Sequence, residues 1–176
     1  QRGTAVTVTG ETNTGWFEIK YNGNTAYVSN AYLGNDPGGA GAGNGPTGGT
    51  SSGSGTATDI ANFAMSFVGY SYVWGGSSPS TGFDCSGLMY YVLTQYGYSM
   101  KRVANDQMTQ GTYVSRSDLQ VGDLVFFGYS GYANHVGMYI GGGNFVHAST
   151  PSTGVRVNSL DESYYKTRFL CGRRII

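Results

Sequence analysis

Hydrophobic and polar residues alternate through residues 4–33, and this alternation predicts β-strands. Val6 and Val8 alternate with polar neighbours in TAVTVTG, while the later runs GWFEIKY and TAYVSNAYL are rich in aromatic and β-branched side chains. Asn22 and Gly23 separate these two later runs, and this dipeptide is typical of a two-residue hairpin turn. Three short strands bury little apolar surface, so we expect this sheet to pack on the rest of the chain or to be part of a larger domain.

Residues 34–55 read GNDPGGAGAGNGPTGGTSSGSG and contain no large apolar side chain. This glycine- and serine-rich composition predicts a flexible linker. A phosphate-binding glycine loop is the alternative, but nothing flanks this stretch as such a loop requires. We therefore expect three regions: residues 1–34, a linker at 35–55, and a domain at 56–176.

The third region opens with residues spaced as in amphipathic helices. In TATDIANFAMSFVG, apolar side chains recur at helical intervals from Ile60 to Val68, after threonine and aspartate capping candidates and before Gly69 as the stop. A second helix is expected from about Asp84 to Tyr96, and a short helical piece is expected near ANDQMTQ.

Strand patterns separated by glycine turns follow these helices. They are DLVFFG, HVGMYI, NFVHAS and GVRVNS, and the chain ends on RFLCGRRII. Helices that come first, followed by a run of short antiparallel-type strands, predict an α+β domain and argue against an alternating doubly wound sheet.

The composition excludes several classes of protein. The 176 residues suffice for one ordinary domain and a small addition, and 10 Lys and Arg residues balance 10 Asp and Glu residues. A neutral chain with 11% charged residues lacks the basic surface that binds nucleic acid. No apolar run approaches the roughly 18 residues of a membrane helix. The chain begins at Gln1 and not at Met, which is compatible with removal of a signal peptide or another upstream segment.

Candidate chemistry centres on Cys85, in the first turn of the second predicted helix. Unpaired backbone N–H groups and the helix dipole favour negative charge there, so we expect a lowered thiol pKa and a reactive thiolate. The two histidines of the chain, His135 and His147, lie on two predicted strands joined by a glycine turn. An antiparallel hairpin can make them neighbours, although the turn leaves their relative face open. A thiolate, an imidazole and a polar group that orients the imidazole are the parts needed for acyl transfer.

Other interpretations of these residues stay open at this point. Cys85 can be a packed hydrophobic residue, or it can form the one possible disulfide with Cys171. Cys85, His135 and His147 have the ligand types of a zinc site, although no close pair such as CxxC or HxxxH occurs. His147 alone can be a hydrogen-bonded histidine of the core. The nucleophile interpretation is favoured because Cys85 lies between an aspartate and a serine.

An ordered set of motifs in the third region resembles one protein family. YVWGGSSPSTGFDCSGLMYYVLTQYG is followed by KRVANDQ, LQVGDLVFFG, NHVGMYIGGGNFVHAS and a terminal RRII, and this order is similar to that of the NlpC family of bacterial cell-wall cysteine peptidases. The resemblance covers residues 56–176 and implies a papain-like α+β core that hydrolyses peptidoglycan stem peptides. It implies no cofactor and no metal.

The resemblance also assigns catalytic roles. It implies that Cys85 is the nucleophile, that His135 is the general base, and that His147 is the polar residue that orients His135. Tyr72, from the Tyr-x-Trp-Gly-Gly stretch, would line the oxyanion site together with the backbone N–H of Cys85. A backbone N–H at a helix start is a credible oxyanion donor.

Substrate contacts follow from the same resemblance. Asp84 and Ser86 would grip a free amino terminus of the stem peptide, and a carboxylate suits an ammonium group. Asp84 can also be the N-cap of the helix, and the two roles can coexist. Arg102 and Gln107 match a family stretch, but a surface salt bridge or a helix cap explains them equally well. Trp74 and the two glycines after it are expected to shape the loop.

The first region resembles the later half of a bacterial SH3-like domain, in GTAVTVTGETNTGWFEIKYNGNTAYVSNAYL. Such modules precede NlpC-type domains, where they bind cell wall or narrow the catalytic groove. The opening strands of that family would lie before Gln1, so we expect residues 1–34 to be a partial domain.

These observations predict a secreted, monomeric cell-wall hydrolase that acts on peptidoglycan stem peptides as a D,L-endopeptidase. It would cut the amide between γ-linked D-glutamate and the diamino acid. An inactive wall-binding module and a papain-like amidase or acyltransferase for another amide or ester are the alternatives, and a zinc hydrolase is a third. We expect no nucleic-acid partner and no membrane span.

Overall fold

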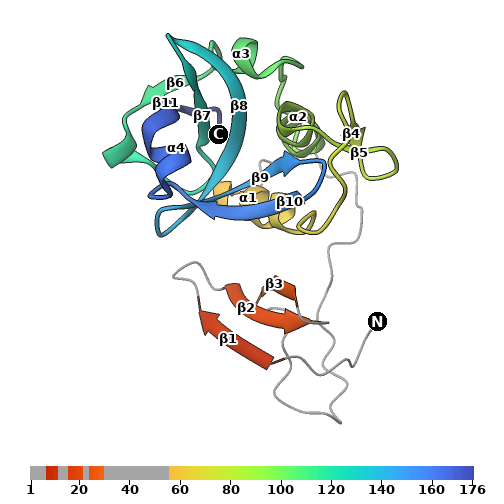
Figure 1. The fold of residues 1–176 in the computed structure, drawn as a ribbon. Coiled ribbons are helices and arrows are strands. Elements are labelled where there is room, and N and C mark those ends of the chain that lie inside the picture. Colours follow the sequence, from red (N-terminus) through yellow and green to blue (C-terminus); the bar gives the residue numbers. More distant parts are fainter. Residues whose placement is uncertain (1–6, 12–15, 22–23, 30–55) are drawn as a thin grey trace. The chain divides into compact units, whose positions relative to one another are not determined.

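The residues that the computed structural model describes are 7–11, 16–21, 24–29 and 56–176. The chain divides into two compact units, Gln1–Ser52 and Gly53–Ile176 (Figure 1). All the candidate site residues belong to the second unit, and each unit is described by itself below.

The first unit contains a three-stranded antiparallel sheet in the order β1-β2-β3. Its strands are β1 (Thr7–Glu11), β2 (Trp16–Tyr21) and β3 (Asn24–Ser29). The three predicted strands are therefore confirmed. Tyr21 pairs with Asn24, which is the register of a hairpin with a two-residue turn. The turn residues Asn22 and Gly23, and the predicted linker 35–55, lie outside the described residues.

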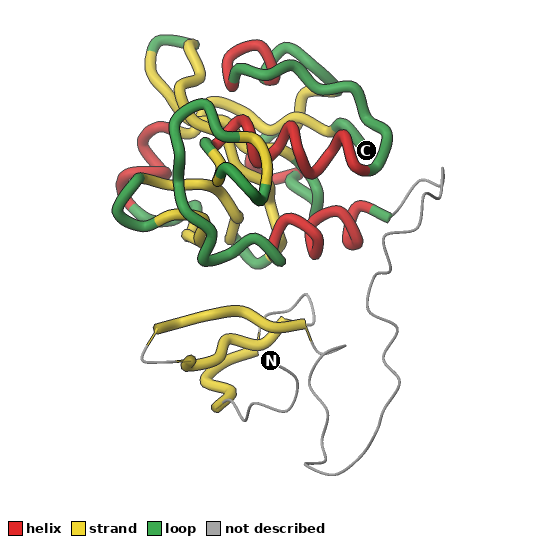
Figure 2. The backbone as a smooth tube through the Cα atoms, turned by 90° about the vertical axis from the view of Figure 1, so that its right-hand side faces the viewer, coloured by secondary structure: helices red, strands yellow, loops and turns green. Residues whose placement is uncertain are grey.

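Local sequence signals begin the two longest helices of the second unit. α1 (Ala57–Met65) follows Thr56, whose hydroxyl accepts from the Asp59 N–H while the Asp59 carboxylate accepts from the Thr56 N–H. α2 (Cys85–Gln95) follows Asp84, whose carboxylate caps the helix. Both predicted helices are confirmed, and they pack side by side (Figure 2). Among the described helices, none is both long enough and apolar enough to cross a membrane.

A six-stranded antiparallel sheet forms the other layer, with its strands in the order β10-β9-β8-β7-β11-β6. The strands are β6 (Thr112–Val114), β7 (Leu124–Tyr129), β8 (Tyr132–Gly141), β9 (Asn144–Thr150), β10 (Gly154–Ser159) and β11 (Phe169–Arg174). β7 to β11 follow the predicted strand patterns. The predicted α+β class, with helices first and an antiparallel sheet after them, is confirmed.

Apolar side chains from α2 and from both faces of the sheet make the core. α2 packs against β8 and β9, and its fully buried side chains are Leu88, Met89, Val92 and Leu93. Burying each such side chain is worth about 2 kcal/mol, so the start of α2 is held against the sheet by its own later turns. Alternate strand residues point to the opposite face, where a second cluster contains Val125, Phe127, Phe145, Leu160 and Tyr165.

Several short elements were not predicted. They are β4 (Ser77–Ser78), β5 (Gly82–Phe83), β6, the 3-10 turn at Arg116–Asp118, and α4 (Ser163–Arg168). None spans enough residues to show a period, and tertiary contacts position them. The short helix predicted near ANDQMTQ is confirmed as α3 (Ala104–Gln107). α1 ends at Met65, and turns continue the chain to Gly69, whose φ is +93°.

Candidate active site

Cys85 is the first residue of α2, and it is 8% exposed. Cys85 and Cys171 are both free thiols, so the disulfide interpretation is wrong. Backbone groups of Val136 in β8, of Ser86 and of Cys85 itself lie close enough to the Cys85 sulfur to lower its pKa. α2 therefore directs its first side chain to the strand that carries His135.

β8 and β9 separate close to this thiol. The two strands pair as far as Met138 and Val146, whereas β8 extends back to Tyr132. In this extension the N–H of Val136 faces Cys85. The first turn of α2 therefore lies against β8 near the end of the β8–β9 pairing.

His135 and His147 form a hydrogen-bonded pair between these strands. Nε2 of His135 lies 2.6 Å from Nδ1 of His147, and the two rings stand at 88° to each other. The prediction that the hairpin makes them neighbours is confirmed. Gly137 keeps the space open, because a Cβ there would lie 2.6 Å from Cδ2 of Phe145 and 3.1 Å from Cβ of His147.

Burial keeps the titratable groups of this pair neutral. It lowers the pKa of His135 to about 4, and burial followed by the neighbouring His135 lowers the pKa of His147 to about 3. Burial also raises the pKa of the Cys85 thiol, against the backbone N–H of Val136, which lowers it. The lowered thiol pKa expected at the helix start is therefore wrong, because loss of solvent outweighs the helix N–H groups. At neutral pH the Cys85 thiol and both imidazoles are therefore uncharged.

Two residues outside the predicted site extend the histidine pair. Nε2 of His147 lies 2.9 Å from Oδ1 of Asn158 in β10. Asn158 Nδ2 donates to both carboxylate oxygens of Glu162, at 2.8 and 2.9 Å. No local sequence motif marks either residue. The pairing of β9 with β10 brings them to His147, and that pairing cannot be read from neighbouring residues. That pairing sets Asn158 opposite Phe145, two residues before His147.

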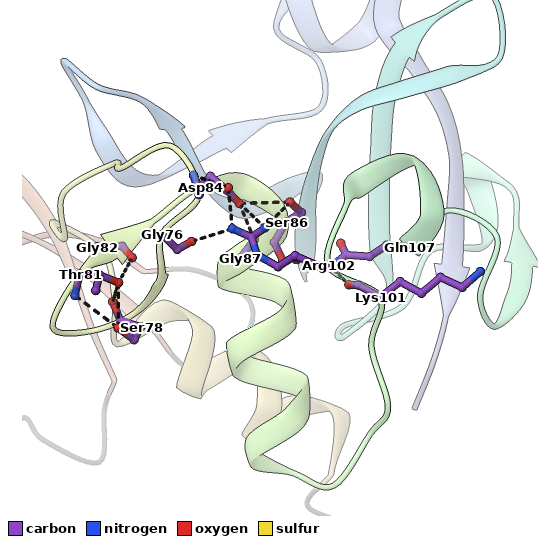
Figure 3. Close-up of polar contacts among 11 residues, drawn as sticks. Gly76, Ser78, Thr81, Gly82, Asp84, Ser86, Gly87, Lys101, Arg102 and Gln107 are labelled. Atoms are coloured by element: carbon purple, nitrogen blue, oxygen red, sulfur yellow. Dashed lines mark hydrogen bonds and ion pairs between the residues drawn. The ribbon is translucent and has the colours of Figure 1, made fainter.

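Asp84 is the centre of a second network, which is charged (Figure 3). Its Oδ1 accepts from the Gly87 N–H at 2.6 Å and from the Ser86 hydroxyl at 3.1 Å. Arg102 donates to both oxygens, at 2.9 and 2.7 Å, and the Gly75 N–H donates to Oδ2 at 2.9 Å. Burial opposes ionisation of Asp84, but the hydrogen bonds from Arg102 and Gly87 outweigh it and hold the carboxyl pKa below its ordinary value. The N-cap interpretation is confirmed.

Ser86 and Gln107 tie this network to α3. The Ser86 hydroxyl accepts from Arg102 at 3.0 Å, and Gln107 Nε2 donates to the carbonyls of Ser86 and Lys101, at 3.0 and 2.8 Å. Ser86 is 6% exposed and Gln107 is fully buried. Arg102 forms a salt bridge as one interpretation expected, but its partner Asp84 is buried and does not lie at the surface. Gln107 braces the first turn of α2. The polar atoms of Asp84 and Ser86 are thus engaged within the protein.

Tyr72 is a half-buried neighbour of Cys85 and Asp84. Burial raises the pKa of its hydroxyl, and the proximity of Cys85 and Asp84 raises this pKa further. Tyr72 also bridges to Phe83, two residues before Cys85. Trp74, two residues after Tyr72, is 87% exposed. The loop before α2 therefore brings the tyrosine of the Tyr-x-Trp-Gly-Gly stretch to the thiol.

The arrangement can carry out acyl transfer. His147 occupies Nε2 of His135, so Nδ1 is the His135 nitrogen left to accept a thiol proton. The neighbouring helix start supplies N–H groups that lack intrahelical partners and can face an oxyanion. In the part of the chain that the structure describes, no group of three or more His, Cys, Asp or Glu side chains is arranged to hold a metal ion.

Comparisons with known proteins agree with this geometry. The family model described as NlpC/P60 family matches residues 69–174, and the one described as bacterial SH3 domain matches residues 1–34. A solved structure, the NlpC/p60 domain of the peptidoglycan hydrolase SagA, superposes with a TM-score of 0.62 at 35% identity. That match covers 68% of this chain and 99% of the SagA chain.

Two curated proteins are similar over the second unit. The chain is 41% identical over 123 residues to gamma-D-glutamyl-L-lysine dipeptidyl-peptidase of Bacillus subtilis (strain 168), which covers 68% of this chain and 41% of that protein. It is 40% identical over 126 residues to murein DD-endopeptidase MepH of Escherichia coli (strain K12), which covers 68% of this chain and 46% of that protein. The chain therefore spans less than half the length of each relative.

Proposed function

Because the chain belongs to the NlpC/P60 family, we propose that residues 56–176 form a cysteine endopeptidase of the bacterial cell wall. The family membership confirms the resemblance of the motifs to the NlpC family, and the match at residues 1–34 confirms the resemblance to a bacterial SH3-like domain. The observation that carries the proposal is the free Cys85 thiol, held at the start of α2 against the residue next to His135.

The proposed bond is the amide between γ-linked D-glutamate and the diamino acid of a peptidoglycan stem peptide. The similarity to a gamma-D-glutamyl-L-lysine dipeptidyl-peptidase supports this bond. The similarity to a murein DD-endopeptidase favours a second candidate, cleavage of the D,D-amide in a peptide cross-link. Both proposed reactions use the same nucleophile and base, and they differ only in the substrate bond that lies against Cys85.

In the first proposed step, Nδ1 of His135 takes the Cys85 proton as the sulfur attacks the amide carbonyl. The S–H bond breaks, a C–S bond forms, and the carbonyl oxygen becomes an oxyanion near the Cys85 N–H and the Tyr72 hydroxyl. The thiol and the imidazole are both uncharged before the substrate binds. The imidazolium and the oxyanion therefore form only during the attack. His147 accepts the Nε2–H of His135 throughout and holds its ring in place.

In the second step, His135 gives its proton to the amide nitrogen, the C–N bond breaks, and the oxyanion becomes a carbonyl again as the amine leaves and the thioester acyl enzyme remains. A water molecule then gives a proton to Nδ1 of His135 while its oxygen bonds to the acyl carbon. The C–S bond breaks, the product leaves as a carboxylic acid, and His135 returns the proton to the sulfur, which regenerates the thiol and the neutral imidazole. The proposed steps need no metal or redox cofactor.

The proposed contact of a substrate ammonium group with Asp84 is limited by Arg102, which already neutralises the carboxylate. The side chain of Asp84 is 11% exposed, so little of its surface is accessible to a substrate. We assign Asp84 and Ser86 first to holding the start of α2 and second to the amino terminus of the stem peptide. Their two roles are separable by the dependence of KM on that amino group.

The wider setting is part of the same proposal. A peptidoglycan substrate requires that the enzyme act outside the cytoplasmic membrane, in or near the cell wall, where we expect it as a secreted monomer. Residues 1–34 would then assist wall binding, and residues 35–55 would link them to the catalytic domain. No nucleic-acid partner is proposed, because the chain is electrically neutral.

The test is digestion of defined muropeptides by the wild-type protein and by Cys85→Ala, followed by mass spectrometry of the products. Cys171→Ala is the matched control, because Cys171 is the other buried free thiol and lies in β11. We expect Cys85→Ala to lower kcat by more than about 10⁴-fold, and Cys171→Ala to retain activity.

The product masses identify the bond. Release after γ-D-glutamate supports the D,L-endopeptidase, whereas separation of cross-linked peptides supports the D,D-endopeptidase. Products that persist undiminished with Cys85→Ala would overturn the cysteine mechanism. Absence of products from every muropeptide, with an intact fold, would favour a wall-binding module.

A further inference from the structure

A chain of hydrogen bonds runs from His135 to the protein surface. Nε2 of His135 contacts Nδ1 of His147 at 2.6 Å, Nε2 of His147 contacts Oδ1 of Asn158 at 2.9 Å, and Asn158 Nδ2 donates to Glu162. His147 is fully buried, whereas Glu162 is exposed. The two imidazoles are therefore connected to a surface carboxylate through one amide.

Glu162 determines which way the Asn158 amide points. An ionised carboxylate only accepts hydrogen bonds, so the group of Asn158 that faces it must be the NH₂. Both carboxylate oxygens lie within 2.9 Å of Asn158 Nδ2, and Oε1 also accepts from the Ser159 N–H at 3.0 Å. The Asn158 oxygen is then left facing His147, where it can only accept.

The direction of the amide decides the tautomers of both histidines. Because Asn158 Oδ1 accepts, Nε2 of His147 must carry a proton, and the Nδ1 of a neutral His147 is then an acceptor. Nε2 of His135 must therefore donate to it. A neutral His135 that is protonated on Nε2 has a bare Nδ1, which is the form that accepts a thiol proton.

We propose that Asn158 and Glu162 are positioning residues that hold His135 and His147 in their Nε2–H tautomers and so keep His135 ready to act as the base for Cys85. With the opposite direction of the amide, His147 would donate from Nδ1, and His135 would carry its proton on Nδ1. His135 would then present an N–H to the thiol and accept nothing. This inference rests on the proposed function, because it assumes that His135 is the base.

Other groups near His147 do not impose the opposite tautomer. The Tyr165 hydroxyl of α4 lies 3.5 Å from Nε2 of His147, which is longer than the 2.9 Å contact with Asn158, and the Ser149 side chain also interacts with this hydroxyl. Arg156 pairs with His147 across β9 and β10, and its positive charge disfavours protonation of the imidazole. The nearby charged and titratable groups are thus His135, Arg156, Glu162 and Tyr165.

The direct test is nitrogen-15 NMR of the histidine rings at neutral pH. The chain contains 2 histidines, so the spectrum holds one signal for each of four ring nitrogens. The proposal predicts that Nε2 is protonated and Nδ1 is bare in both rings. Protonated Nδ1 in His147 or His135 of the wild-type protein would overturn it, whatever the activity.

Variants test the cause of the tautomer. Glu162→Ala frees the Asn158 amide to turn, so we expect Nδ1–H signals to appear and kcat to fall about 10-fold, in the range seen for outer partners of a functional histidine. Glu162→Gln keeps an oxygen acceptor for Asn158 Nδ2, so it should retain most of the Nε2–H tautomers and most of kcat. Asn144→Ala is the matched control, because its amide on the neighbouring strand bonds only to the Gly142 carbonyl among the contacts described.

Asn158→Ala removes the acceptor itself, and we expect it to lower kcat about 10- to 100-fold with little change in KM. Unchanged tautomers and kcat in both Glu162→Ala and Asn158→Ala would refute the proposal. The tautomers are also measured in Cys85→Ala, which has no turnover under the proposed mechanism. Correct tautomers in an enzyme whose activity survives Cys85→Ala would sink the proposed function and leave the tautomer assignment standing.

Discussion

Two polar networks lie near Cys85, and they differ in charge and in how far apart in the sequence their members lie. The Asp84 network is charged, and three of its members lie within three residues of one another: Asp84, Ser86 and Gly87. The histidine network has neutral imidazoles and draws His135, His147 and the residues beyond them from separate strands and a helix start.

The difference follows from what each network does. Asp84 can remain charged in a buried place because Arg102 and two backbone N–H groups compensate it, and a charged cap holds the helix start firmly. The general base that we propose must instead be neutral before the reaction, and burial favours the neutral form of His135. The charged network holds the helix start, and in the proposed mechanism the histidine network supplies the proton acceptor.

The largest effect is expected at the reactive end of the histidine network. His135→Ala should lower kcat by about 10⁴-fold, or about 5 kcal/mol of transition-state stabilisation, because no other group replaces the base. Steady-state kinetics on a defined muropeptide measures this loss. Asn134→Ala, at the exposed preceding residue of β8, should leave kcat unchanged. A similar loss in both variants would show that the strand, and not the imidazole, is responsible.

The next effect is on the charged network. Asp84→Ala removes the cap and leaves Arg102 without its carboxylate, so we expect the free energy of unfolding in urea to fall by about 3 kcal/mol. Asp84→Asn keeps an oxygen for the Gly87 N–H and should lose about 2 kcal/mol.

The control for that prediction is the exposed ion pair between Arg116 and Asp161, in which the Asp161 side chain is 76% exposed. Asp161→Ala should cost at most about 0.5 kcal/mol, because solvent screens the pair. Equal losses for Asp84→Ala and Asp161→Ala would contradict the distinction between a buried, hydrogen-bonded pair and a surface pair.

Acid should weaken the fold mainly through the histidine network. Both histidines have folded pKa values, about 4 and about 3, below the unfolded value of 6.5. Below pH 6.5 the unfolded chain therefore binds more protons than the folded chain does. The contribution of the two histidines to stability is present above that pH and is lost as the pH falls. From about pH 7 to about pH 5.5 we expect a loss of about 2 kcal/mol.

Urea unfolding at the two pH values measures this loss, and His147→Asn should roughly halve it. The folded pKa of Asp84 lies below 3.8, so the charged network keeps its contribution throughout this range. If the free energy of unfolding stays constant down to pH 5.5, the folded pKa values of the histidines are not lowered. That result would contradict the effect expected from their burial.

The smallest effect is expected at Ser86, which joins the charged network by two hydrogen bonds. Ser86→Ala should lower the free energy of unfolding by about 1 kcal/mol. Ser80→Ala, at an exposed serine that contacts Ser78, should be neutral within about 0.5 kcal/mol. A loss at Ser86 above that of Asp84→Asn would mean that the hydroxyl, and not the carboxylate, organises the helix start.

Features that depend on neighbouring residues were predicted well from the sequence. The cap at Asp84, the start of α2 at Cys85 and the strand patterns of β7 to β11 all follow from spacings of two to four residues. The hairpin between β8 and β9 also predicted that His135 and His147 are close, because one glycine turn joins their strands.

Features that depend on burial or on distant pairing were missed or wrong. The helix start predicts a lowered pKa for Cys85, but the burial that raises this pKa comes from packing on β8. Asn158 and Glu162 carry no local signal, and the β9–β10 register alone brings Asn158 to His147.

By itself, the sequence predicted the order of the longer helices and strands, the family motifs and the candidate reactive side chains, because these depend on periodicity and on residue type. Only the tertiary structure decided the protonation of those side chains and the partners that orient them. Desolvation and hydrogen-bond direction are properties of the folded neighbourhood, and residues far apart in the chain create that neighbourhood.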